Sequence, residues 1–232
     1  MTTSFLETDR AAAQFRFGVA RLPDGPIIRY AEQGDPTGEP IILLHGYTDS
    51  WYSYSRLLPL LMPGGYHVFA IDQRGHGCSA RPSDGYTMDD FAADVDGFME
   101  AVGVRRATLV GHSMGSMVAR RVAERYPHRV SRLVLIGAVL GQNEATRELG
   151  MAVRQLTDPV SATFVREFQE STVHAPVPVP FMDGVVAESL KLPARVWQAA
   201  IDGVNQFDDR ADLGRSARRR CCSGASMMPT SR

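Results

Sequence analysis

The sequence predicts an α/β protein with a mostly parallel sheet flanked by helices. Short runs rich in Val, Ile, Leu and Phe alternate with helical patterns, which is typical of a sheet covered by helices. The run Pro40–Leu44, "PIILL", is apolar throughout, as expected for a strand buried on both faces. At 232 residues and 44% hydrophobic, the chain is long enough for one large domain with a core.

The N-terminal third predicts a hairpin followed by the first parallel strands. Residues 15–22 and 26–32 flank a Pro-Asp-Gly turn, which favours an antiparallel hairpin. The strand at residues 40–44 ends at His45 and Gly46, where the chain must turn. A helix is expected from about residue 50 to 61, and the strand "HVFAID" then ends at Asp72.

The middle of the chain continues the alternation. The stretch "YTMDDFAADVDGFMEAVG" predicts an amphipathic helix with Thr87 as its N-cap, Asp90 completing a capping box and Gly103 just past its end. "ATLVGHS" predicts a buried strand, residues 114–125 a helix and "SRLVLIGA" the next strand. Three β-helix-β steps therefore lie between residues 40 and 138.

The alternation of strands and helices ends after residue 138. The stretches "ATRELGMAVRQL", "ATFVREFQES" and "ARVWQAAIDGV" are helical patterns, they are interrupted by "HAPVPVPF", and none of this segment predicts a strand. We therefore divide the chain into a core at residues 1–140, a helical cap at residues 141–210 and an aberrant or disordered tail at residues 211–232.

Charge and cysteine content limit the partners. The 25 basic and 26 acidic side chains nearly cancel, so no global field attracts nucleic acid or an anionic membrane. Cys78, Cys221 and Cys222 make no disulfide framework, residues 1–10 lack a signal-peptide pattern, and no run approaches the ~18 apolar residues of a membrane helix. We expect a cytoplasmic protein without a nucleic-acid or membrane partner, of open oligomeric state.

The stretch "GHSMG" carries the chemistry. It matches G-x-S-x-G between a predicted buried strand and a predicted helix, which is the context that this motif requires. Ser113 would occupy a tight turn with an unfavourable backbone conformation, and Gly111 and Gly115 would let neighbouring backbone pass close by. The hydroxyl of Ser113 would then stand out above the sheet.

Two backbone N–H groups are candidates for stabilising a negative oxygen beside Ser113. Met114 follows the serine at the start of a helix, and Tyr47 follows His45-Gly46 at the end of the strand at residues 40–44. The N–H of Tyr47 would face Ser113 if the two strands are neighbours. The alternative is that His45-Gly46 is only a turn.

Three motifs in order, "HGYTDS", "DQRGHGCS" and "GHSMGS", make the chain resemble the α/β-hydrolase fold family over about residues 15–210. The resemblance implies that Ser113 is the nucleophile, that Tyr47 and Met114 form the oxyanion hole, and that the cap shapes the pocket. It implies acyl transfer, without cofactor or metal, on a small apolar acyl-type substrate such as an ester, thioester, lactone or carbon-carbon-bonded diketone. Family members that open epoxides or displace halide carry aspartate at the elbow, so Ser113 disfavours those reactions.

The resemblance also shows what the sequence lacks. In the family, an acid and then a histidine follow the nucleophile after later strands, and here the last strands are missing. We expect Asp72 and Arg74 to build a loop, and Glu144 or Asp158 would have no histidine to orient. His174, in the cap, is the one histidine that could reach Ser113, and we do not expect it to. The six histidines are His45, His67, His76, His112, His128 and His174. Catalysis by this chain is therefore expected to be impaired.

The C-terminal tail suggests why. Read in a shifted frame, Cys221-Cys222 must decode to leucine and Met227-Met228 to aspartate, whichever synonymous codons are used. With permissible codons elsewhere, the tail becomes an apolar strand, a turn and an aspartate, which is the missing acid motif. We hypothesise that the tail is a frame-shifted reading of that segment, and the alternative is a genuine disordered basic arm.

Two other functions stay open. The chain could be a non-catalytic protein that binds a small ligand or regulates on the same scaffold, which needs a pocket but no triad. RNA binding through "RSARRR" is disfavoured, because no aromatic residue is interleaved with the arginines.

Overall fold

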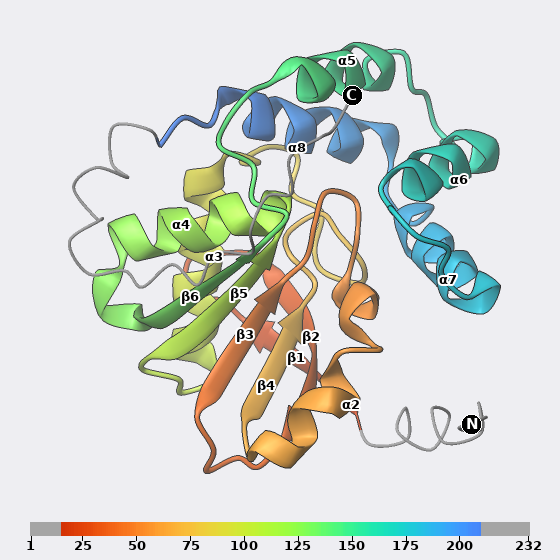
Figure 1. Cartoon of the computed structure of the whole chain (residues 1–232). Helices are drawn as coiled ribbons and strands as arrows, with labels where there is room; N and C mark the ends of the chain where they lie inside the picture. The colour runs from red at the N-terminus through yellow and green to blue at the C-terminus, as the bar shows by residue number, and fades with distance from the viewer. Residues whose placement is uncertain (1–14, 210–232) are drawn as a thin grey trace, which may run out of the picture.

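A six-stranded sheet in the order β1-β2-β4-β3-β5-β6 organises the molecule. The computed structural model describes residues 15–209 (Figure 1). The strands are β1 Arg16–Arg21, β2 Ile27–Gly34, β3 Pro40–Leu44, β4 His67–Ile71, β5 Ala107–His112 and β6 Val130–Ile136. β1 pairs with β2 and β2 with β4 in antiparallel fashion, whereas β3 runs parallel to β4 and β5, and β5 parallel to β6. The predicted fold class is confirmed, and β3 and β5 end side by side.

Helices cover both faces of this sheet. α3 Met88–Ala101 and α4 Met114–Arg125 pack in one apolar cluster with β-strand residues such as Ile42 and Leu109. Thr87 and Asp90 form the predicted capping box. The short helices η1 Trp51–Tyr54 and α2 Leu58–Leu61 pack on the other face. η2 Met62–Gly64 follows α2, and η3 Pro127–Arg129 precedes β6.

The helix predicted at about residues 50–61 is therefore wrong. Pro59 lies in this segment and Pro63 just after it, and each stands in the first turn of a new short helix. Proline lacks the N–H that a continuous helix needs and clashes with the preceding turn, so the segment forms three short pieces instead of one helix.

Four further helices lie together over the end of the sheet at which β3 and β5 finish (Figure 1). They are α5 Glu144–Val153, α6 Ala162–Ser171, α7 Val179–Ser189 and α8 Ala194–Gln206, called the cap helices below. α7 was not predicted, because its first turn lies inside "HAPVPVPF". Pro180 is compatible with a helix there, since the first turn uses no intrahelical N–H. No helix among residues 15–209 is long and apolar enough to cross a membrane.

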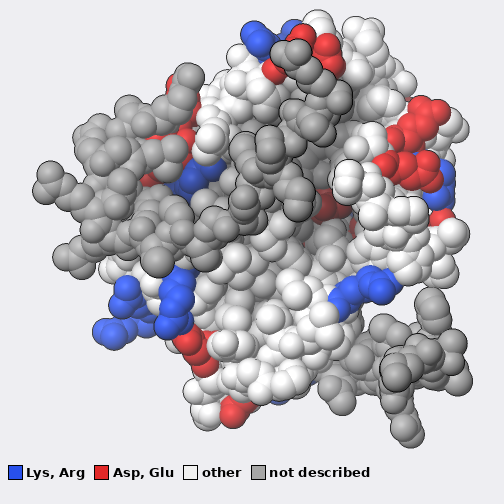
Figure 2. All heavy atoms as spheres, viewed as in Figure 1, with Lys and Arg blue, Asp and Glu red and all other residues white. Residues whose placement is uncertain are grey.

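β6 is the last strand of the sheet within the described residues, as the sequence predicts. Val134, Leu135 and Ile136 are 44%, 36% and 43% exposed, whereas all but the first residue of β3 are buried. β6 therefore exposes apolar side chains at its C-terminal end. Figure 2, viewed as in Figure 1, shows few charged side chains over the middle of the molecule.

Candidate active site

Ser113 lies alone between the last residue of β5 and the first residue of α4. Its backbone has φ 50° and ψ −117°, a combination that an L-residue seldom adopts and that costs about 1–3 kcal/mol. Two hydrogen bonds hold it there: the N–H of Ser113 donates to the carbonyl of Ile136 (3.0 Å), and the N–H of Ser116 donates to the carbonyl of Ser113 (2.9 Å). The serine thus sits on the sharp strand-to-helix turn that the motif predicts.

The two glycines of the motif are required by close backbone contacts. A Cβ at Gly111 would overlap the carbonyl of Gly115, and a Cβ at Gly115 would overlap the carbonyl of Leu44. Without a side chain at Gly111, the end of β5 can lie close to the first turn of α4. Without a side chain at Gly115, the start of α4 can pack directly on the end of β3. These two approaches bring Ser113 beside the loop that follows β3.

That loop, residues 45–50, reaches the serine at Gly46. The position that a Cβ would take at Gly46 is 3.1 Å from Nδ1 of His112, 3.2 Å from Oδ2 of Asp49 and 3.4 Å from Cβ of Ser113. Tyr47 follows in the chain and is buried. Met114 begins α4, so its N–H has no carbonyl one turn earlier in the helix to bind. The structure therefore brings Ser113, Met114 and the Gly46–Tyr47 peptide together.

The two fully buried histidines are held by the scaffold. His45 bonds the carbonyl of Gly46 through Nδ1 (2.8 Å), and its Nε2 accepts from the N–H of Gln73 (3.0 Å). His76 bonds the carbonyl of Arg74 (2.7 Å). Burial lowers the pKa of His45 well below its ordinary value and lowers the pKa of His76 to about 4. Both imidazoles are therefore neutral near pH 7.

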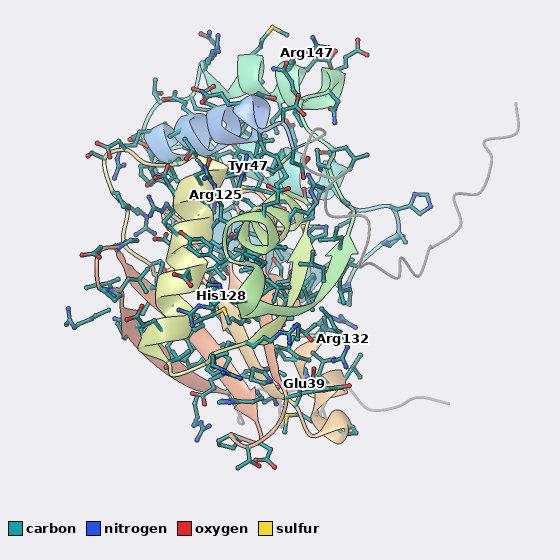
Figure 3. The ribbon with its side chains drawn as sticks, turned by 90° about the vertical axis from the view of Figure 1, so that its left-hand side faces the viewer. Glu39, Tyr47, Arg125, His128, Arg132 and Arg147 are labelled. Atoms are coloured by element: carbon teal, nitrogen blue, oxygen red, sulfur yellow. The ribbon has the colours of Figure 1, made fainter. Side chains whose placement is uncertain are left out.

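The other four histidines do not serve Ser113 either. His112 is partly buried, burial lowers its pKa, and no hydrogen bond joins it to Ser113 in the described structure. His67 contacts Glu32 (2.7 Å), and His174 is exposed. His128 lies far from Tyr47, beyond the end of α4 (Figure 3). Within residues 15–209, no imidazole is placed to take the serine proton.

The loop after β4 is built as the sequence predicts. Asp72 accepts the N–H of Trp51 (2.9 Å) and of Cys78 (2.8 Å), and burial raises its pKa to about 6. Arg74 donates twice to Asp94, at 2.6 Å each. These contacts join loops to one another and to α3, and they leave neither side chain directed to the serine.

The two alternative acids, Asp158 and Glu144, have no part in the surroundings of Ser113 described above. Asp158 accepts the N–H of Ala194 at the start of α8 (2.6 Å), and Glu144 is an exposed residue at the start of α5. Neither has a histidine beside it. No group of three or more His, Cys, Asp and Glu side chains within residues 15–209 is arranged to hold a metal ion.

Two residues in or against the loop that follows β3 escaped the sequence analysis. Asp49 is a partly buried carboxyl next to Gly46, and burial raises its pKa to about 7 against the hydrogen bonds from Ser53 and Gln169. Gln169 is a buried residue of α6 that reaches the same loop. Asp49 lies inside the quoted "HGYTDS" and could have been found there; Gln169 carries no motif.

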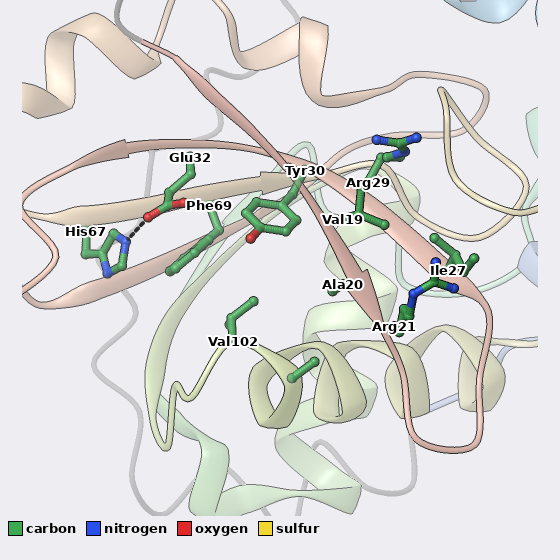
Figure 4. Close-up of a pocket in the computed structure, with 11 residues that line it drawn as sticks. Val19, Ala20, Arg21, Ile27, Arg29, Tyr30, Glu32, His67, Phe69 and Val102 are labelled. Atoms are coloured by element: carbon green, nitrogen blue, oxygen red, sulfur yellow. Dashed lines mark hydrogen bonds and ion pairs between the residues drawn. The ribbon is translucent and has the colours of Figure 1, made fainter.

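A hollow of about 690 Å³ lies elsewhere, between β1, β2, β4 and the end of α3 (Figure 4). Arg21 and Arg29 line it, and within it Glu32 and His67 contact one another (2.7 Å). It shares no lining residue with the surroundings of Ser113 described above. We assign it no part in the candidate active site.

Comparison with known proteins identifies the class. The family described as "alpha/beta hydrolase fold" matches residues 39–172, so the chain belongs to the α/β-hydrolase fold family. A non-heme chloroperoxidase of Streptomyces lividans is 41% identical over 123 residues, or 53% of this chain and 45% of that protein. Epoxide hydrolase A of Mycobacterium tuberculosis is 37% identical over 120 residues, or 50% of this chain and 37% of that protein. The crystal structure of a bromoperoxidase from Bacillus anthracis has a TM-score of 0.74 at 26% identity, covering 85% of this chain and 77% of that chain.

The chain spans less than half the length of these two curated relatives. The tail assigned to residues 211–232, and with it the shifted-frame hypothesis, lies outside the described residues. Nucleotide sequence around the codons of Gly214 and Arg215 tests that hypothesis directly.

Proposed function

We propose that this protein derives from serine hydrolases that transfer an acyl group through Ser113. The observation that carries the proposal is the backbone of Ser113, at φ 50° between a strand and a helix and beside Gly46. The hydroxyl oxygen would attack the carbonyl carbon of a small ester, thioester or lactone, and its proton would pass to a water molecule. The bond between the carbonyl carbon and the leaving oxygen or sulfur would break, and the leaving group would keep the bonding electrons and take up a proton from water. A second water molecule would later hydrolyse the serine ester and restore the hydroxyl.

The N–H groups of Tyr47 and Met114 would bind the oxygen that becomes negative during the attack. One such donor contributes about 10²–10³-fold to the rate in a serine hydrolase. Around them, the cap helices supply an apolar environment, with Phe168 and Trp197 beside the ring of Tyr47. These surroundings favour a small apolar acyl group.

Slow turnover is proposed for this chain. Serine is a weak nucleophile without a base, and loss of the triad histidine costs on the order of a million-fold, leaving ~10³–10⁴-fold over water. Because no imidazole of the described residues is hydrogen-bonded to the Ser113 hydroxyl, we expect hydrolysis of an activated aryl ester at background or slightly above. The same deficit would slow deacylation, so an acyl group should accumulate on the serine.

The experiment is to incubate the full chain with 4-nitrophenyl acetate and to measure acetylation of the peptide containing Ser113 by mass spectrometry. The wild-type chain should gain one acetyl group there, and Ser113→Ala should not. Ser83→Ala is the matched control, because Ser83 is an exposed loop residue whose hydroxyl bonds only the neighbouring Asp84. Equal labelling of the wild-type chain and Ser113→Ala would contradict the proposed acyl transfer. Rapid multiple turnover by the wild-type chain would contradict the expected impairment.

A second function is favoured by the absence of a base at Ser113 among the described residues. A non-catalytic protein on this scaffold would bind a small apolar ligand near Ser113 and transfer no acyl group. Saturable binding of such a ligand without acetylation of Ser113 would support this function over acyl transfer.

A further inference from the structure

Three successive residues of the loop that follows β3, Tyr47, Thr48 and Asp49, lie against the cap helices. The ring of Tyr47 stands edge-on to Phe168 of α6 (centroids 5.7 Å apart) and to Trp197 of α8 (5.6 Å). Its hydroxyl donates to the carbonyl of Trp197 (2.7 Å). Figure 3 shows Tyr47 where the core meets the helices above it. The side chain of this residue is therefore fixed by the cap helices, while its peptide adjoins Gly46.

Thr48 comes next and has φ 60°, which is unusual for a β-branched residue. Such a conformation persists only where surrounding contacts enforce it. Ser189 of α7 donates to the Thr48 carbonyl (2.9 Å), and Nε2 of Gln169 donates to the Thr48 hydroxyl (3.2 Å). Nε2 of Gln169 also donates to the Ser189 hydroxyl (2.8 Å). All three residues are buried, so water does not compete for these bonds.

Asp49 completes the contact. Its carboxyl lies between the two parts of the molecule: Ser53 on the core side and Gln169 on the cap side both lower its pKa, against the larger effect of burial. The N–H of Asp49 donates to the carbonyl of Gly46 (3.3 Å), which closes a turn around Tyr47 and Thr48. The oxyanion-binding turn, defined as residues 46–49, is thus fixed at one side by the core and at the other by Gln169 and Ser189.

We propose that Gln169 and Ser189 are positioning residues that hold the oxyanion-binding turn, so that the N–H of Tyr47 faces the oxygen of an acyl group on Ser113. This inference rests on the proposed acyl transfer. Neither side chain needs to touch the substrate. A movement of α6 or α7 would release Thr48 and turn the Tyr47 peptide away, so docking of the cap helices and stabilisation of the oxyanion are coupled.

The first test needs no catalysis. Hydrogen exchange of the backbone amides of residues 47–49 is measured in the full chain for the wild type, Gln169→Leu and Ser189→Ala. Loss of about one buried hydrogen bond should speed local opening by roughly tenfold at these amides. The matched control is Gln198→Leu, because Gln198 of α8 donates only to the carbonyls of Val153 and Leu156, beside α5.

Exchange at residues 47–49 should be unchanged in Gln198→Leu. Unchanged exchange in both Gln169→Leu and Ser189→Ala overturns the proposal, and so does an equal increase in all three variants. Ser189→Ala removes a single hydroxyl, so it keeps the test informative if Gln169→Leu does not fold. Exchange of β5 amides reports whether each variant retains the native sheet.

The second test measures the rate of acetylation of Ser113 as a function of 4-nitrophenyl acetate concentration. Gln169→Leu should lower the maximal rate by about 10–100-fold, as expected for a displaced oxyanion donor, while the half-saturating ester concentration changes by less than about threefold. An unchanged maximal rate overturns the proposal. If the wild-type chain shows no acetylation, acyl transfer fails, and the exchange experiment still decides whether Gln169 and Ser189 hold the turn.

Discussion

Two turns in this molecule use a rare backbone conformation, and they are stabilised in different ways. Thr48 and Ser113 are the residues other than glycine with positive φ in the described structure, at 60° and 50°. Ser113 is held by features of the core alone: the glycines two residues on either side of it and the hydrogen bond from its N–H to Ile136 at the end of β6. Thr48 is held by side chains 121 and 141 residues later in the chain. The turn at Ser113, called the serine turn below, thus depends on the core. The oxyanion-binding turn at residues 46–49, called the threonine turn below because it contains Thr48, depends on the cap helices.

Adding a methyl group at the serine turn should have the largest effect. Gly115→Ala would place a Cβ on the carbonyl of Leu44, and β3 and α4 cannot separate without disturbing the core. We expect a loss of at least about 3 kcal/mol in the free energy of unfolding. Urea denaturation measures it. Gly97→Ala is the control. Gly97 lies in α3, and a Cβ there would be no closer than 3.5 Å to its neighbours, which is an ordinary contact. Because alanine favours a helix more than glycine does, this variant should gain about 0.5–1 kcal/mol in the free energy of unfolding.

The pH dependence of the threonine turn should give the next largest effect. Burial raises the pKa of Asp49 from 3.8 to about 7, so the folded state binds a proton more tightly than the unfolded state. The stability that this carboxyl contributes is present below about pH 4 and is lost as the pH rises to about 7. Partial solvent contact limits the loss to about 2 kcal/mol.

Asp49→Asn removes this titration. The stability of Asp49→Asn relative to the wild type should therefore increase from pH 4 to pH 7, as measured by urea denaturation at each pH. Asp72, whose pKa is raised to about 6, is present in both proteins and cancels in the difference. A difference that is constant across this range would show that Asp49 is not buried in the folded chain.

Replacing the strained residues by glycine should give the smallest effects, and these should have opposite signs. Ser113→Gly relieves backbone strain and should stabilise by about 1 kcal/mol after the entropy cost of glycine. Thr48→Gly also relieves strain but loses the hydrogen bond from Gln169, and we expect a net destabilisation of about 1 kcal/mol. Thermal unfolding of the two variants makes the comparison. Equal changes would mean that the cap helices do not hold Thr48.

The sequence could predict features that are formed by residues close together in the chain, and it could not predict contacts between residues far apart. β3, α4 and α6 occur at their predicted bounds, and the turn at Ser113 was predictable because its glycines and flanking elements are adjacent in the chain. α7 was missed because Pro178 and Pro180 resemble a break and not a helix start. Gln169 was missed because a buried amide on an amphipathic helix has no local signature, and its partners become neighbours only in the folded chain.

The guanidinium of one residue, Arg120, is hydrogen-bonded to both ends of the segment that carries the cap helices, at Val139 and Asp209. Buried Arg120 of α4 donates to the carbonyl of Val139, where the segment leaves the core, and to the carboxylate of Asp209, where it returns. Departure and return points therefore coincide, as in an insertion whose stem is closed. Such a segment can be exchanged for one of another length or shape at little extra cost in chain entropy. The scaffold could thereby acquire a new lid without rebuilding the turn that presents its serine.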